Sequence, residues 1–117
     1  MNRARERRIE QEIVVDAYTP EERAVSWNYY LEEKLQFPFK ARCVALRAIS
    51  PLKKGEEVEV VGMAKEEHCL HEMFVLIRFA GRKLGVPLVQ LDPIKPDKMT
   101  RAAINDWRYW LTMGYAF

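Results

Sequence analysis

The sequence lacks the features that most enzyme and membrane-protein classes require. Its 117 residues include only two cysteines, two histidines and two serines, and the five glycines form no phosphate-binding loop. The longest apolar stretches, such as Met73 to Ile77, are far shorter than the roughly 20 residues that cross a bilayer. We therefore expect neither a hydrolase nor any other enzyme, and no membrane span.

A strong excess of one charge is also missing. Nineteen basic and 17 acidic side chains leave a net charge of +2, so the overall field indicates no class of charged partner. No apolar core of a signal peptide follows the arginine-rich N-terminal segment, so we expect a cytoplasmic protein. In that reducing compartment Cys43 and Cys69 should remain free thiols.

Residues 1–12 are dominated by charge. Four arginines alternate with glutamates, and Ile9 is the only large apolar side chain after Met1. This composition predicts a flexible charged tail ahead of a single domain at residues 13–117. The arginines could form a nucleic-acid-binding arm, but the interleaved glutamates dilute the field, so nucleic acid is not an expected partner.

Two segments carry the apolar periodicity of amphipathic helices. Thr19, Pro20 and Glu22 form an N-cap, an N1 proline and a capping-box glutamate, which predict a helix that begins at Pro20 and ends before Phe37-Pro38. A second helix is predicted from a cap at Thr100 to Gly114. Their tryptophans share a stripe with leucines, which favours core packing over base stacking.

The residues between these helices favour β-structure. Four strands are predicted, at Ala41–Ile49, Glu57–Met63, Met73–Phe79 and Lys83–Val89, with a short β-prone run at Ile13–Val15. Gly81 predicts a tight hairpin between two of the strands. The expected fold class is α+β: a small curled antiparallel sheet or SH3-like barrel of four to five strands, flanked by an N-terminal and a C-terminal amphipathic helix.

One segment combines several possible transition-metal ligands. His68, Cys69 and His71 lie within four positions, and zinc binds imidazoles and thiolates. A structural zinc site usually needs a second pair of ligands, which is missing unless Cys43 folds beside Cys69. Zinc or another transition metal at this segment is therefore an alternative hypothesis, against a polar loop with a partly buried cysteine.

Calcium is not indicated by any local motif. An EF-hand loop needs closely spaced aspartates and asparagines around a glycine, whereas the four aspartates here are widely separated. Adjacent glutamates such as Glu66-Glu67 most often form a solvated face. A calcium site would have to be assembled from distant elements.

The order of several short motifs nevertheless resembles a known family. The motifs cover nearly everything from Ile13 onward and are Ile13-Val14-Val15-Asp16-Ala17-Tyr18, Trp27 with Tyr29-Tyr30-Leu31-Glu32, Phe37-Pro38-Phe39-Lys40-Ala41, Val58-Glu59-Val60 with Gly62-Met63, Glu72-Met73-Phe74-Val75, Val86-Pro87-Leu88 with Gln90-Leu91 and Pro93, and Asp106-Trp107 with Tyr109-Trp110 and Gly114-Tyr115. In this order and spacing the chain resembles the bacterial CcbP-type calcium-binding proteins.

The resemblance implies a small non-enzymatic calcium buffer or sensor that uses surface carboxylates. The matching positions are Asp16, Glu32 and Glu33, which we take as candidate calcium ligands. Members typically carry acidic clusters before the central strand and the last helix, where this chain has lysines at positions 65, 95 and 98. We therefore expect weak affinity, near millimolar. The alternative is a protein or nucleic-acid interaction module that has lost calcium binding.

Overall fold

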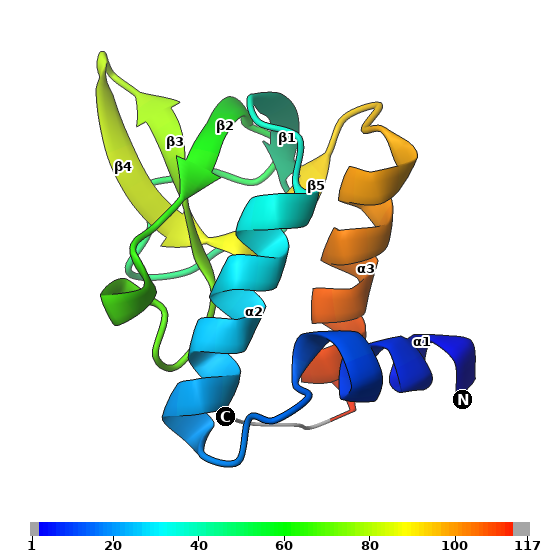
Figure 1. Cartoon of the computed structure of the whole chain (residues 1–117). Coiled ribbons are helices and arrows are strands. Elements are labelled where there is room, and N and C mark those ends of the chain that lie inside the picture. Colours follow the sequence, from blue (N-terminus) through cyan, green and yellow to red (C-terminus); the bar gives the residue numbers. More distant parts are fainter. Residues whose placement is uncertain (1–2, 114–117) are drawn as a thin grey trace.

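The structure is a computed structural model that describes residues 3–113. The chain begins with a helical segment, continues through a long helix and a sheet, and ends with a second long helix (Figure 1). The elements are α1 (Arg3–Arg8), η1 (Ile9–Ile13), α2 (Pro20–Lys34), β1 (Phe39–Cys43), β2 (Glu57–Met63), η2 (Glu66–His68), β3 (Phe74–Phe79), β4 (Arg82–Pro87), η3 (Leu88–Gln90), β5 (Leu91–Pro93) and α3 (Lys98–Thr112).

The strands form one antiparallel sheet in the order β4-β3-β2-β1-β5. β4 and β5 are its two edges and do not pair with each other, so the sheet is open and not a closed barrel. The predicted hairpin is confirmed: Ala80 and Gly81 both have positive φ, 51° and 79°, and join β3 to β4. The α+β fold class is confirmed, with five strands between the long helices.

The core lies between the sheet and the two long helices. Figure 1 shows α2 and α3 side by side, with α1 crossing near one of their ends. Trp27 is fully buried, and its ring centroid lies 5.1 Å from Trp107 and 5.6 Å from Trp110. These edge and tilted aromatic contacts join α2 to α3, as expected for core residues. Within residues 3–113, no helix combines the length and apolarity needed to cross a membrane.

Local capping signals predicted the start of α2 correctly but placed the start of α3 too late. α2 begins at Pro20, and the Thr19 hydroxyl accepts a hydrogen bond from the Glu22 amide at 3.1 Å, as the capping motif predicted. α3 begins earlier than predicted, because Asp97 is its N-cap and accepts from the Thr100 amide at 2.8 Å. Thr100 instead accepts a hydrogen bond from the Gln36 amide. The predicted end at Gly114 lies outside the described residues.

The N-terminal segment differs from the expected flexible tail. Residues 3–13 are helical, and Ile9 and Ile13 are each only 3% exposed. These two side chains join the main apolar cluster, so residues 3–12 pack against the region predicted as the domain. In the predicted β-prone run, Ile13 ends this helical segment and Val14 and Val15 lie in the turn that follows, so the run is not a strand.

The sheet also corrects the predicted strand ends. β1 stops at Cys43, and the chain then turns at Arg47–Ser50, where the Ser50 amide bonds to the Arg47 carbonyl. The remainder of the predicted strand is therefore loop, and Leu46 and Ile49 are exposed. β5 was not predicted, because it has only three residues and contains Pro93; it pairs with β1.

Candidate functional site

The acidic side chains fall into two groups, and the first group is paired with arginine. Four carboxylates on the surface of the sheet and its loops each lie within 3.2 Å of a guanidinium. The pairs are Glu57 with Arg42, Glu59 with Arg78, Glu72 with Arg47, and Asp92 with both Arg101 and Arg108. Their negative charge is already compensated, which makes them poor calcium ligands.

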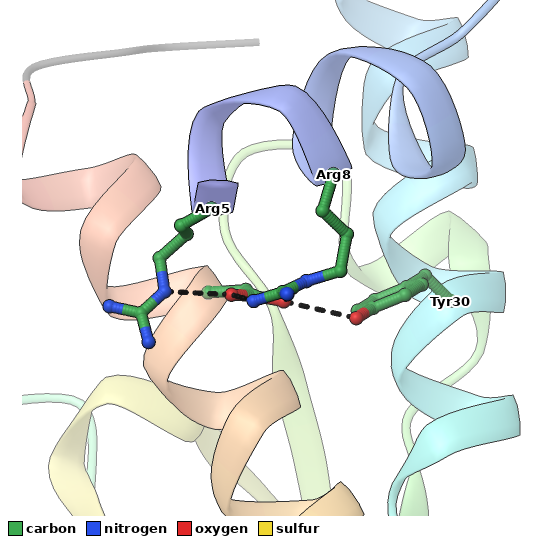
Figure 2. Close-up of polar contacts among 4 residues, drawn as sticks. Arg5, Arg8 and Tyr30 are labelled. Carbon is green, nitrogen blue, oxygen red and sulfur yellow. Dashed lines mark hydrogen bonds and ion pairs between the residues drawn. The ribbon is translucent and has the colours of Figure 1, made fainter. Parts of the chain in front are cut away.

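Asp106 is the most completely paired carboxylate of this kind. Its side chain is fully buried, and it accepts hydrogen bonds from Arg5 at 2.9 Å, from Arg8 at 2.6 and 2.9 Å, and from the Tyr30 hydroxyl at 3.0 Å (Figure 2). We call these four residues the Asp106 cluster. Both carboxylate oxygens are occupied by protein donors, so calcium has no access to them.

The electrostatics of the Asp106 cluster follow from burial and charge. The hydrogen bond to Asp106 raises the pKa of Arg8 and holds it in its charged form. Burial, followed by the negative charge of Asp106, raises the pKa of Tyr30 to about 12, so its hydroxyl stays protonated and donates. The cluster fixes α1 against α2 and α3, because Arg5 and Arg8 come from α1 and Tyr30 and Asp106 from the other two helices.

A second tyrosine of α2 lies beside carboxylates that have no arginine. Hydrogen bonding to Glu66 and the charge of Glu66 raise the pKa of Tyr29, and Glu32 adds a smaller charge effect. Glu32 lies three residues after Tyr29 on the same face of α2, and Glu66 comes from η2, which packs against α2. Among residues 3–113, neither Glu32 nor Glu66 forms an ion pair. We call Tyr29, Glu32 and Glu66 the Tyr29 corner.

The predicted calcium ligands do not form one site. Asp16 is exposed, has φ of 63° and accepts a hydrogen bond from the Tyr18 hydroxyl at 3.4 Å. It precedes α2, whereas Glu32 and Glu33 lie near the end of that helix, about 18 Å of helix beyond Pro20. Calcium ligands lie about 2.3–2.6 Å from the ion, so Asp16 cannot share an ion with the two glutamates. Glu33 is exposed and lies 3.8 Å from Lys34.

The predicted transition-metal residues are also not arranged as ligands. His68 and His71 are exposed, and Cys69 is fully buried. The Cys69 sulfur accepts hydrogen bonds from the Asn28 amide group and the Phe74 amide, both at 3.4 Å, and burial raises its pKa. A thiol that keeps its proton is a poor zinc ligand. No three His, Cys, Asp or Glu side chains of residues 3–113 are gathered around one potential ion position.

The Tyr29 corner fits a weak calcium site by the chemistry of its donors. It supplies two carboxylates and a hydroxyl, all oxygen donors of the kind that calcium prefers. Calcium takes six to eight oxygens, water among them, so water would have to complete the shell. Sequence reasoning named Glu32 but treated Glu66 as a solvated surface residue, because no local signal links Tyr29 with Glu66.

Comparison with known proteins agrees with this oxygen chemistry. A family model described as calcium binding, of the CcbP type, matches residues 7–111. The chain belongs to the CcbP calcium-binding family. The match begins within the N-terminal helix, so that the CcbP pattern includes part of the segment that sequence analysis had treated as a tail.

Two solved structures support the CcbP assignment. The crystal structure of Anabaena CcbP is 40% identical and superposes with a TM-score of 0.90, over 100% of this chain and 96% of that one. A structure described as a calcium binding protein in the calcium-binding form is 39% identical, with a TM-score of 0.87 over 99% of this chain and 95% of that one. A search of curated proteins found no match.

Proposed function

We propose that this CcbP-family chain is a cytoplasmic, non-enzymatic calcium buffer or sensor that binds the ion weakly at the Tyr29 corner. The observation that carries the proposal is the pair Glu32 and Glu66. Glu32 lies one helical turn after the exposed Tyr29, Glu66 comes from η2, which packs against α2, and neither carboxylate forms an ion pair within residues 3–113. The calcium-binding form of a 39% identical relative supports calcium as the ion.

The expected affinity is low for two reasons. Two carboxylates give the ion fewer charges than a dedicated loop, and Lys65 directly precedes Glu66 in the sequence. Sites with few charged ligands bind calcium with Kd of about 10⁻⁴–10⁻³ M. The occupancy of such a site changes only when the calcium concentration approaches this Kd.

Asp16 and Glu33 have secondary roles in this proposal. Glu33 follows Glu32 in α2 and adds negative charge at the same end of the helix. Asp16 precedes the other end of α2 and would bind an ion only at a separate, weaker position. His68, Cys69 and His71 have no part in the proposed site.

The proposal is tested by calorimetric titration with calcium at low salt, with magnesium as the comparison ion. Calcium should give a saturable heat that magnesium does not reproduce, because magnesium demands rigid octahedral geometry and dehydrates reluctantly. The double variant Glu32→Gln/Glu66→Gln should weaken binding by at least about tenfold, since calcium affinity follows ligand charge.

Glu21→Gln is the matched control, because it removes an exposed carboxylate from the beginning of the same helix. It should leave the titration unchanged. A flat calcium trace for the wild type would contradict the proposal and favour an interaction module that has lost calcium. Equal binding by the double variant and the control would place the ion elsewhere.

A further inference from the structure

A cavity of about 210 Å³ lies between the N-terminal helical segment and α3. It is lined by Glu6, Ile9, Glu10, Val14, Tyr109 and Trp110. Ile9 and Trp110 are 3% and 7% exposed, so its walls include apolar side chains of the core. Among the described residues 3–113, Glu6 and Glu10 are the acidic residues of this lining, and both come from the helical segment.

The Asp106 cluster forms this cavity by fixing one of its walls. Arg5 and Arg8 bind Asp106 and thereby hold α1 against α3 (Figure 2). The Arg5 guanidinium also lies 5.9 Å from the centroid of the Tyr109 ring. Asp106 balances one of the two positive charges of Arg5 and Arg8, so these three side chains together with Glu6 and Glu10 carry a net charge of −1.

Glu6 and Glu10 give the lining of the cavity its negative charge. Within residues 3–113, neither Glu6 nor Glu10 forms an ion pair. Both border the same apolar cavity. A ligand that complements this cavity would therefore have an apolar body, which contacts the apolar lining, and a positive group, which lies beside the two glutamates.

The size of the cavity limits its occupant. An apolar cavity of about 150 Å³ accepts benzene, whereas drug-sized ligands need roughly 300–1,000 Å³. A volume of about 210 Å³ therefore fits one ring with a short arm. We propose that this groove binds a small organic cation with an apolar body, an arylalkyl ammonium, with its ring against Val14 and Trp110 and its charge beside Glu6 and Glu10.

The test uses three ligands with the same ring and different charge, titrated into the full-length protein and followed by amide NMR shifts. Phenethylammonium should bind with saturable shifts at residues 6–14 and 109–110. 2-Phenylethanol should bind less tightly, and phenylacetate least. Absence of these shifts with phenethylammonium, or equal affinity for all three ligands, would overturn the proposal.

Variants separate the charged and the apolar contributions. Glu6→Gln/Glu10→Gln should weaken phenethylammonium binding by about two- to fivefold for each carboxylate, the range that exposed ion pairs give. The same variant should leave 2-phenylethanol binding unchanged. Glu21→Gln removes an exposed helical carboxylate elsewhere and should change neither affinity. An unchanged affinity of the double variant for the ammonium ligand would overturn charge recognition.

Val14→Phe addresses the cavity itself. The larger ring should fill the space that the ligand ring occupies and abolish binding of phenethylammonium and 2-phenylethanol. Full binding by a folded Val14→Phe protein would overturn the assigned location. If this variant fails to fold, the surface variants at Glu6 and Glu10 still decide the proposal. Calcium titration is a separate readout, since neither outcome depends on the Tyr29 corner.

Discussion

Tyr29 and Tyr30 are neighbours in α2, and each places its hydroxyl beside a carboxylate, but the two sites have opposite properties. Tyr30 faces the buried Asp106, which also accepts hydrogen bonds from Arg5 and Arg8. Tyr29 lies on the surface, 56% exposed, beside Glu66 and near Glu32. The first site already contains its cations within the chain, and the second does not.

The comparison shows that a carboxylate paired with arginine is unavailable to an external cation, whereas an unpaired carboxylate remains available. A buried carboxylate is stable only when it is paired, so the Asp106 cluster must keep its arginines. An exposed carboxylate is solvated by water and needs no partner. Tyrosine and carboxylate therefore help to join three helices at the Asp106 cluster. At the Tyr29 corner the same two groups leave carboxylate oxygens exposed to solvent.

The largest expected effect is at Asp106. Asp106→Asn leaves Arg5 and Arg8 without their shared counter-ion, and removal of one partner of a buried ion pair costs about 3–5 kcal/mol. We expect a loss near 3 kcal/mol, because both arginines are partly exposed and can be rehydrated. Urea denaturation measures this loss. A change below 1 kcal/mol would mean that the Asp106 cluster does not hold the helices together.

The two tyrosines form a matched pair of variants. Tyr30→Phe removes a hydrogen bond to a charged acceptor and should cost about 1.5 kcal/mol in the same denaturation experiment. Tyr29→Phe should produce no measurable loss, because water replaces the hydroxyl at an exposed site. Equal losses for the two variants would remove the distinction between a structural and an open site.

The stability of the protein at alkaline pH provides a second test of the Tyr30 hydrogen bond. The pKa of Tyr30 is raised from 10.0 to about 12, so its contribution to stability is complete below pH 10 and is lost as the pH rises toward 12. In that interval the unfolded chain releases the proton while the folded protein retains it. Tyr30→Phe should therefore lose less stability than the wild type between these pH values. Parallel stability curves would contradict the assignment.

A smaller effect concerns the affinity of the open site. Lys65→Gln removes a positive charge next to Glu66 and should strengthen calcium binding by up to about fivefold at low salt, the equivalent of about 1 kcal/mol of Coulomb repulsion. Lys54→Gln is the control, because Lys54 precedes the opposite end of β2. Equal affinities of these two variants would show that Lys65 does not weaken the site.

The parts of the fold that the sequence predicted depend on local signals. Thr19, Pro20 and Glu22 define the start of α2, and alternating valines with a hairpin glycine define β2 to β4. Both kinds of signal lie within a few residues, so no tertiary information is needed. The CcbP resemblance likewise depends on the order of short motifs.

The parts that were missed depend on contacts between distant residues. Arg5 and Arg8 lie 101 and 98 residues from Asp106, so their composition alone predicted a tail. Their attachment to the core depends on the buried carboxylate that α3 supplies. The Tyr29 corner was missed for the same reason, because tertiary packing of η2 against α2 brings Glu66 near Tyr29. β5 was missed because it is defined by its pairing with β1.

The central claim is that calcium binds at the Tyr29 corner and not at the Asp106 cluster. Calcium titration followed by backbone amide NMR of the full-length protein tests it most directly. We expect saturable shifts concentrated at residues 29–33 and 65–67, with residues 5–8 and 106 unchanged, and loss of the shifts in Glu32→Gln/Glu66→Gln. Saturable shifts centred on residues 5–8 and 106, or unchanged shifts in the double variant, would contradict the account.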